Sequence, residues 1–132
     1  MNKLQKKLLE KAKVTAKYSY SPYSKFRVGA AVLSDGKIFT GTNIENASYS
    51  LCICAERVAM ANAISGGSKK IDGIAIACVD AKVKSNPGEL MPCGACRQWL
   101  SELAKDAWIV ILGHNKIFKI DDLLPNAFSL KK

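Results

Sequence analysis

The sequence contains little histidine, little arginine and no long hydrophobic run, and each shortage excludes a class of protein. The longest unbroken apolar stretches, Ile74 to Val79 and Trp108 to Leu112, fall far short of the ~18 residues that span a bilayer. We therefore expect no membrane-spanning segment. His114 is the only histidine, which argues against Ser-His-Asp or Cys-His nucleophilic catalysis, because both place a histidine beside the nucleophile.

Arginine is scarce although the chain is basic, with 20 lysines and arginines against 11 acidic residues and a net charge of +9. Lysines crowd the N-terminal segment, at positions 3, 6, 7, 11, 13 and 17. They alternate there with Leu4, Leu8 and Ala12, which is typical of an amphipathic helix with a solvated lysine face. Because arginine is the side chain best suited to bidentate phosphate contacts, its scarcity argues against a nucleic-acid partner.

The length and composition fit one ordinary globular domain over residues 1–132. The chain has 48% hydrophobic and 23% charged residues, and domains of this size bury about two-thirds of their surface without a disulfide scaffold. The N-terminal lysines stand where a signal peptide would need its apolar stretch. The five cysteines therefore indicate a reducing, cytoplasmic location and thiols that bind metal or take part in catalysis.

The hydrophobic pattern predicts helices that alternate with strands. Helices are expected over about 3–18, 54–65 and 93–105, with a short last helix capped by Asp121. Strands are expected at 26–33, at 38–39 on the return arm of a hairpin turned by Asp35-Gly36, at 71–79, at 108–112 and at 117–120. The longest irregular connection covers 80–92. This order predicts an α/β fold in which helices cover a mixed sheet.

Two short segments carry the chemistry, each at the start of an expected helix. They are Cys54-Ala55-Glu56-Arg57 and Pro92-Cys93-Gly94-Ala95-Cys96-Arg97. A helix N-terminus lowers thiol pKa values and favours the thiolate form that binds zinc. The two-residue gap between Cys93 and Cys96 lets one turn chelate one ion. Zinc held by Cys54, Cys93 and Cys96 would keep a fourth position for water, as catalytic sites do.

Glu56 favours a catalytic site, because a structural site has no use for a carboxylate two positions from a ligand. In mid-helix its side chain would point ~200° away from that of Cys54, so both can face one metal only if Cys54 caps the helix. We predict that the helix starts there and that Glu56 takes a proton from metal-activated water. Three thiolates around Zn²⁺ leave an excess negative charge, which Arg57 and Arg97 could offset by hydrogen bonds to the sulfurs.

Other interpretations of the same residues stay open. Cys52 could add a fourth thiolate and make a structural zinc module that binds protein or RNA, although its spacing from Cys54 is tighter than usual. Cys78 lies in an apolar run that is typical of a buried core thiol. Arg57 and Arg97 could be ordinary surface residues. From composition alone, four further candidates are typical of core aromatics or of turn and surface residues: Phe26, Phe128, Asn43 and Glu45.

The chain resembles the zinc-dependent cytidine deaminases of the small, homotetrameric type. Besides the two cysteine segments, the resemblance rests on Tyr23 to Ala31, Asn43 to Ala47 and Leu123 to Phe128, so that it covers nearly the whole chain. It implies a five-stranded mixed sheet sandwiched between helices, a three-layer α/β/α fold. It also implies one Zn²⁺ per subunit, held by the three cysteines of the two segments.

The resemblance further implies hydrolytic deamination of cytidine and deoxycytidine to uridine and deoxyuridine, with release of ammonia, in pyrimidine salvage. Glu56 is the implied proton shuttle. Phe26 would stack on the pyrimidine, while Asn43 and Glu45 would hydrogen-bond the ribose. Phe128 would reach the pocket of a neighbouring subunit. The expected partners are thus a nucleoside and further copies of the chain. Deaminases of other amino-heterocycles, or of bases within a polynucleotide, share the metal chemistry and stay open alternatives.

Overall fold

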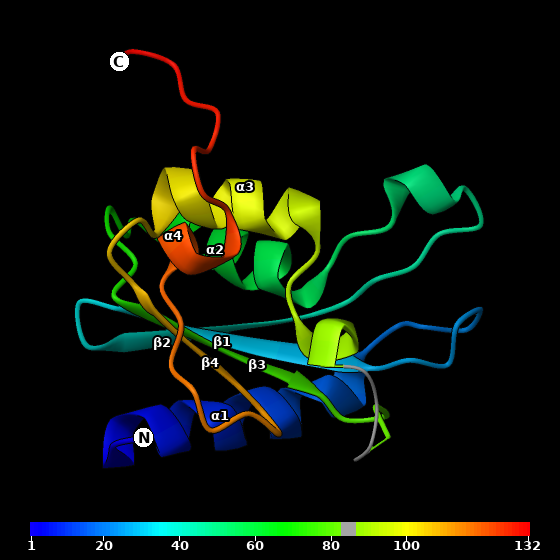
Figure 1. The fold of residues 1–132 in the computed structure, drawn as a ribbon. Coiled ribbons are helices and arrows are strands. Elements are labelled where there is room, and N and C mark those ends of the chain that lie inside the picture. Colours follow the sequence, from blue (N-terminus) through cyan, green and yellow to red (C-terminus); the bar gives the residue numbers. More distant parts are fainter. Residues whose placement is uncertain (83–86) are drawn as a thin grey trace.

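A four-stranded mixed sheet forms the centre of the computed structural model, which describes residues 1–82 and 87–132 (Figure 1). Its strand order is β2-β1-β3-β4. Strand β1 (Val28–Ser34) pairs antiparallel with β2 (Lys37–Thr42) and with β3 (Gly73–Cys78), and β3 pairs in parallel with β4 (Trp108–Ile111). The expected hairpin is confirmed, with Asp35 and Gly36 at φ 50° and 74° in its turn, as two-residue hairpin turns require.

Helices cover both faces of the sheet, which confirms the predicted three-layer fold (Figure 1). Helix α1 (Lys3–Thr15) lies on one face, and α2 (Ala55–Ser65), α3 (Gly94–Leu103) and the short α4 (Ile120–Leu123) lie on the other. Short 3-10 helices follow α1 and interrupt two loops, at Ala16–Tyr18, Tyr49–Leu51 and Pro87–Leu90. Within the described residues, no helix is both long and apolar enough to cross a membrane.

The two faces of the sheet bury two separate apolar clusters. Because side chains alternate along a strand, Ala31 of β1 packs with Leu8 and Ala12 of α1, whereas Ala30 and Val32 pack towards α2 and α3. The cluster under α2 and α3 also contains the largest buried side chains, among them Met60, Ile74, Ile76, Leu100, Ile109 and Ile111. This cluster fixes α2 and α3 against the strands and so sets where their first turns lie.

Glycines let two helices approach the sheet closely. A Cβ atom on Gly41 of β2 would overlap the backbone nitrogen of Ala59 in α2 and would stand 2.8 Å from the carbonyl oxygen of Ala55. On the opposite face, a Cβ on Gly29 would overlap the carbonyl oxygen of Ala12 in α1. Both positions therefore need a residue without a side chain.

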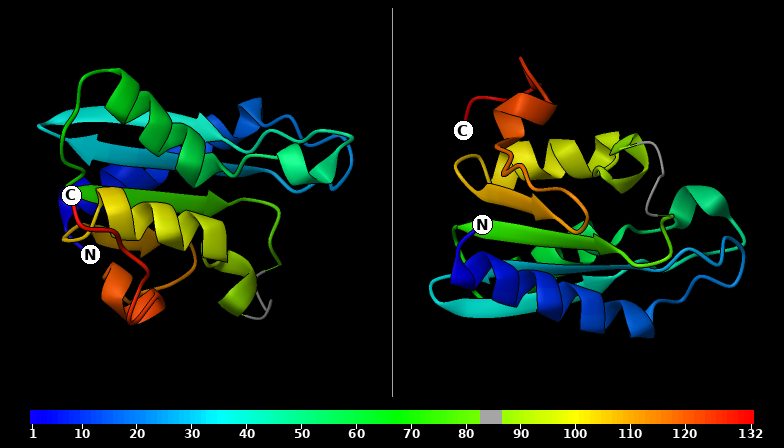
Figure 2. Two further views of the ribbon diagram at one scale, coloured as in Figure 1. Left: turned by 90° about the horizontal axis from the view of Figure 1, so that it is seen from above. Right: turned by 60° about the horizontal axis from the view of Figure 1, so that its bottom comes forward.

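The topology brings the first turns of α2 and α3 to one edge of the sheet. Strands β2 and β3 both run antiparallel to β1, so they point in the same direction, and β4 runs parallel to β3. Helix α2 follows β2 and helix α3 follows β3. Both helices thus begin beyond the carboxyl ends of their strands, the usual place for sites in such sheets, and Figure 2 shows them side by side with their first turns at the same end.

The structure corrects the expected strands in two places. The sheet has four strands rather than five in the described part of the chain: of 117–120, only Phe118 pairs, in an isolated antiparallel bridge with Ile109, because α4 already begins at Ile120. The first strand begins at Val28 rather than Phe26, because side chains take the backbone N–H groups of residues 26–28.

Two further expectations concern helix ends and a loop. The N-cap of α4 is Lys119 rather than Asp121, and its backbone N–H donates to the Asp122 carboxylate at 3.0 Å. In the connection expected at 80–92, residues 83–86 lie outside the described residues and 87–90 form a 3-10 helix. The helices expected at 54–65 and 93–105 are confirmed to within two residues at each end. The helix expected at 3–18 is α-helical only to Thr15, and residues 16–18 continue it as a 3-10 helix.

Candidate active site

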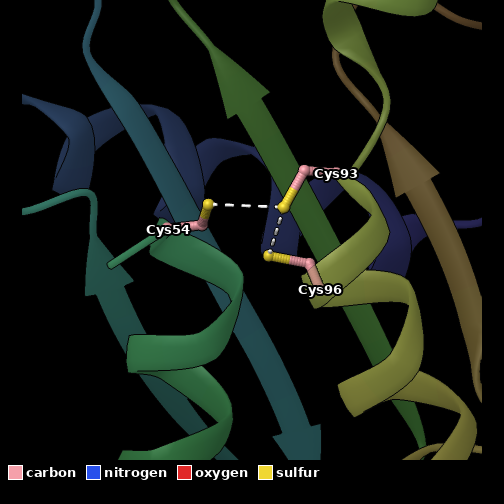
Figure 3. A group of neighbouring side chains, drawn as sticks. All are labelled: Cys54, Cys93 and Cys96. Carbon is pink, nitrogen blue, oxygen red and sulfur yellow. Dashed lines mark hydrogen bonds between the residues drawn. The ribbon is translucent and has the colours of Figure 1, made fainter. Parts of the chain in front are cut away.

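Three cysteines meet at the first turns of α2 and α3. Cys54 is the N-cap of α2, Cys93 is the N-cap of α3, and Cys96 follows in the first turn of α3. The Cys93 sulfur lies 3.6 Å from that of Cys54 and 3.5 Å from that of Cys96, and all three sulfurs are within 4.8 Å of one another (Figure 3). The predicted cap position of Cys54 is confirmed, and it turns that side chain towards α3.

The spacing and the chemistry of these thiols fit zinc. Tetrahedral ligands with Zn–S bonds of about 2.3 Å would be about 3.8 Å apart, close to the observed separations. The Cys54 pKa is lowered to about 5, mainly because its sulfur accepts a hydrogen bond from the Cys96 thiol and also one from Arg57. Cys54 is thus a thiolate at neutral pH. Cys96 is buried but Cys93 is exposed, so three sulfurs can hold an ion and leave one side open.

Glu56 places a carboxyl group beside this cluster. It lies in the first turn of α2 with 5% of its surface exposed. Burial raises its pKa to about 7, because a low-dielectric environment disfavours the charged form. A carboxyl group with a pKa near neutrality can both accept and release a proton at physiological pH, which is the requirement for general acid–base chemistry.

The two arginines that follow the cysteine segments have different positions. Arg57 donates from Nη2 to the Cys54 sulfur at 3.5 Å, as expected. Arg97 differs from the expectation: it donates from Nε to the Pro92 carbonyl at 2.8 Å and from Nη1 to the Leu123 carbonyl at 2.7 Å. Side chains of consecutive helical residues point about 100° apart, so Arg97 points away from Cys96. It fastens the chain before Cys93 to the end of α4.

The remaining cysteines lie outside the cluster. The Cys52 sulfur accepts from the Asn46 backbone N–H at 3.3 Å and approaches the Asn46 carbonyl at 3.7 Å, and it is not part of the metal-ligating group. The alternative of a four-cysteine structural module is therefore wrong. Cys78 is buried at the end of β3, and burial raises its pKa to about 12. It is a core thiol.

The structure brings three expected substrate contacts together on the loops that flank the hairpin. Asn43 donates from Nδ2 to the Phe26 carbonyl at 2.8 Å, and its Oδ1 accepts from the Val28 backbone N–H at 2.9 Å. Glu45 follows two residues later and accepts from backbone N–H groups of the loop before Phe26. The Phe26 ring is half-buried and packs against the core cluster beneath α2 and α3.

Phe128 is not joined to this group within one chain. Its side chain is 70% exposed. Its backbone carbonyl accepts a hydrogen bond from the Gln98 side chain of α3 at 3.0 Å, which holds the C-terminal segment against the outer helices while the ring projects into solvent.

Three residues that sequence reasoning missed support the loops of the site. The Ser19 hydroxyl donates to Asn43 Oδ1 at 2.5 Å, and the Ser24 hydroxyl donates to the Glu45 carboxylate. Asp80 accepts from the Arg27 guanidinium at 2.7 and 2.9 Å and from its backbone N–H at 2.8 Å. Serines and an aspartate in turns occur in most proteins, so only their partners, more than 20 residues away, distinguish them.

Three thiols placed to hold one metal ion with an open side, beside a buried carboxyl group of near-neutral pKa on an α/β fold, are the arrangement of a zinc-dependent hydrolase. The family model described as the cytidine and deoxycytidylate deaminase zinc-binding region matches residues 2–112. The chain therefore belongs to the cytidine and deoxycytidylate deaminase family, whose cofactor is zinc.

Known proteins agree with this assignment. The chain is 43% identical over 126 residues to a probable cytidine deaminase of Dictyostelium discoideum, covering 93% of this chain and 82% of that protein. It is 41% identical over 128 residues to a cytidine deaminase of Sporosarcina psychrophila, covering 93% and 90%. The crystal structure of cytidine deaminase from Burkholderia pseudomallei is 40% identical, has a TM-score of 0.83, and is matched over 97% of this chain and 100% of that one.

Proposed function

We propose that the protein catalyses the hydrolytic deamination of cytidine and deoxycytidine to uridine and deoxyuridine, with release of ammonia. The observation that carries this proposal is the buried Glu56 carboxyl group beside the three-sulfur cluster, in a chain of the deaminase family. Cys54, Cys93 and Cys96 would hold the zinc. Bound zinc would lower the pKa of a water molecule from 15.7 to about 7 and so make it a nucleophile at neutral pH.

Glu56 would move the protons of the reaction. Its carboxylate accepts a proton from the attacking water and delivers it to N3 of the pyrimidine as the water oxygen bonds to C4. It then transfers the second water proton to the exocyclic amine. The C4–N bond breaks, ammonia leaves, and the water oxygen remains as the C4 carbonyl. A pKa of about 7 suits both transfers, because the group is present in both forms at neutral pH.

The hydrogen-bonding capacity left on Asn43 and Glu45 supports a role in holding the sugar. Both acceptor positions of Asn43 Oδ1 and one of its two amide hydrogens have partners among the described residues, which leaves one N–H to donate. The Glu45 carboxylate accepts three hydrogen bonds and keeps room for a fourth. One donor and one acceptor suit hydroxyl groups, which both give and take hydrogen bonds. Phe26 would offer its ring to the base.

The proposal extends to domain organisation, cellular location and oligomeric state. We propose one catalytic domain over residues 1–132, acting in the cytoplasm in pyrimidine salvage as a homotetramer. Exposed aromatic rings that contact one another support self-association, because monomeric domains seldom expose contiguous apolar patches: Tyr23 and Tyr49 are both more than half exposed, and their ring centroids are 6.1 Å apart. Phe128 would enter the pocket of a neighbouring subunit, so a separated monomer would be inactive.

Ammonia release from cytidine by the zinc-loaded protein tests the proposal. Glu56→Gln should lower kcat by about 10²–10⁴-fold with zinc still bound, whereas Glu10→Gln, which changes an exposed carboxylate on α1, should match the wild type. Removal of zinc by a chelator should abolish turnover, and adding zinc should restore it.

Two outcomes would overturn the proposal. One is a Glu56→Gln variant that keeps most of its activity. The other is a wild-type protein that binds one zinc per chain yet releases no ammonia from cytidine or deoxycytidine. A parallel assay with a cytosine-containing oligonucleotide distinguishes a nucleoside enzyme from a polynucleotide deaminase.

A further inference from the structure

The backbone of Phe26 is held from both sides by polar side chains. Its N–H donates to the Ser24 hydroxyl at 3.0 Å, and its carbonyl accepts from Asn43 Nδ2 at 2.8 Å. These contacts replace the strand pairing that begins only at Val28. The backbone that carries the ring is therefore held by one side chain of its own loop, Ser24, and one of the loop after β2, Asn43, rather than by strand pairing.

Ser24 connects this backbone to Glu45. A serine hydroxyl has one proton to give and two lone pairs to accept with. The Phe26 N–H can only donate and the ionised Glu45 carboxylate can only accept, so the Ser24 proton must point to Glu45 Oε2 while the oxygen accepts from Phe26. The Ser24 hydroxyl thus joins the Glu45 carboxylate to the Phe26 backbone by two hydrogen bonds whose directions are fixed.

The backbone between Ser24 and Phe26 has an unfavourable conformation that the Ser24–Glu45 contacts stabilise. Lys25 has φ 58°, the left-handed region that side-chain-bearing residues rarely occupy. Such a conformation costs of order 1 kcal/mol and persists only where neighbouring contacts maintain it. The Glu45 carboxylate maintains it from one side, accepting from the backbone N–H groups of Tyr23 at 3.0 Å and Ser24 at 3.1 Å as well as from the Ser24 hydroxyl.

We propose that Ser24 is a positioning residue that couples sugar binding by Glu45 to base stacking by Phe26. The inference rests on the proposed function, because that function assigns both contacts. Ser24 itself touches neither substrate nor metal. Its hydroxyl fixes both the orientation of the Glu45 carboxylate and the position of the Phe26 backbone. A nucleoside whose sugar binds Glu45 therefore has the Phe26 ring positioned to stack on its base.

The coupling predicts which kinetic constants change. Loss of a hydrogen bond to a charged group typically costs about tenfold to a hundredfold in an equilibrium constant. Ser24→Ala should therefore raise KM for cytidine by about that factor with little change in kcat, since the cysteines and Glu56 lie on other elements. On 2′,3′-dideoxycytidine, which lacks the 2′- and 3′-hydroxyls of the sugar, the same substitution should cost severalfold less.

The experiment compares Ser24→Ala, Ser24→Thr and Ser65→Ala with the wild type on both nucleosides. Threonine keeps the hydroxyl at an exposed position and should restore the wild-type KM. Ser65 is exposed at the end of α2 opposite Cys54, so its substitution controls for loss of a surface hydroxyl. The Glu45 carboxyl titration, followed by NMR, provides a readout independent of turnover. Its low pKa, due mainly to the Ser24 hydroxyl, should rise in Ser24→Ala alone.

The outcomes separate the two proposals. Three results would overturn the role of Ser24 and leave the proposed function intact. They are wild-type turnover with unchanged KM in Ser24→Ala, an equal loss on both nucleosides, and no rescue by threonine. A zinc-loaded wild type that deaminates neither nucleoside overturns the proposed function, and the role of Ser24 with it. A KM increase that is severalfold larger on cytidine than on the dideoxynucleoside, rescued by threonine and accompanied by the Glu45 shift, supports the coupling.

Discussion

Replacing Gly41 with alanine should damage the metal site from a distance, because it would push α2 outward. The new Cβ would overlap the backbone nitrogen of Ala59 and stand 2.8 Å from the carbonyl oxygen of Ala55. Backbone atoms within a helix cannot rotate out of the way, so the helix must move as a unit. That helix has Cys54 at its cap and Glu56 in its first turn.

The size of the effect follows from the overlap. Ordinary contact distances begin near 3.4 Å, so the helix has to shift by about 1 Å, and overpacking of this kind costs about 1–3 kcal/mol. At roughly 4 °C per kcal/mol for a chain of this length, the melting temperature should fall by about 4–12 °C. A misplacement of about 1 Å at reacting groups can reduce activity about 100-fold.

Gly29→Ala is the matched control, because its Cβ would overlap the carbonyl oxygen of Ala12 in α1 on the opposite face. That helix carries none of the cysteines and not Glu56. Both variants should melt at lower temperature than the wild type at equal protein concentration. Only Gly41→Ala should also bind zinc more weakly, measured by competition with a chelating dye. Assayed below both melting temperatures, only this variant should have a kcat/KM about 100-fold below that of the wild type. Equal activity losses in the two variants, or a fully active Gly41→Ala, would refute the reasoning.

Three other predictions concern the site and its supports. Cys93→Ser should abolish tight zinc binding whereas Cys52→Ser should bind like the wild type; equal zinc content in the two variants would contradict the three-sulfur site. Arg57→Ala should weaken zinc about 10–100-fold in the same dye competition, because partners of metal ligands have effects of that size, and an unchanged affinity would remove Arg57 from the site. The Arg27 guanidinium lowers the Asp80 pKa to about 2, below the ~3.9 of aspartate in an unfolded chain. The contribution of Asp80 to the free energy of unfolding is therefore complete above pH ~4 and is lost as the pH falls towards 2. The difference in melting temperature between the wild type and Asp80→Asn should accordingly be constant from pH 7 to 5 and shrink below pH 4; a difference that grows on acidification would have the wrong sign.

Local geometry explains what could be predicted from the sequence. The cap position of Cys54 follows from side-chain directions in a helix, since Cys54 and Glu56 can serve one site only if the helix begins between them. The hairpin at Asp35-Gly36 follows equally from turn chemistry. In both cases the determining residues are neighbours in the chain, so no knowledge of the tertiary structure is needed.

Contacts between distant segments explain what could not be predicted. The partner of Ser24 is 21 residues away in the chain and that of Asp80 is 53 residues away, and no periodicity connects them. The direction of Arg97 depended on the carbonyl of Leu123, 26 residues later. The segment 117–120 was expected to be a strand, yet the start of α4 at Ile120 left room for only one pair.

Because the three sulfurs come from two helices, the order of zinc binding and folding is constrained. Cys93 and Cys96 share one turn and can chelate an ion in an unfolded chain, but Cys54 is 39 residues from Cys93. Closing a loop of that length costs about 3 kcal/mol of chain entropy, which packing of the assembled sheet offsets. We therefore expect the ion to gain its third sulfur when β3 docks beside β1, at a rate set by the folding chain and independent of zinc concentration.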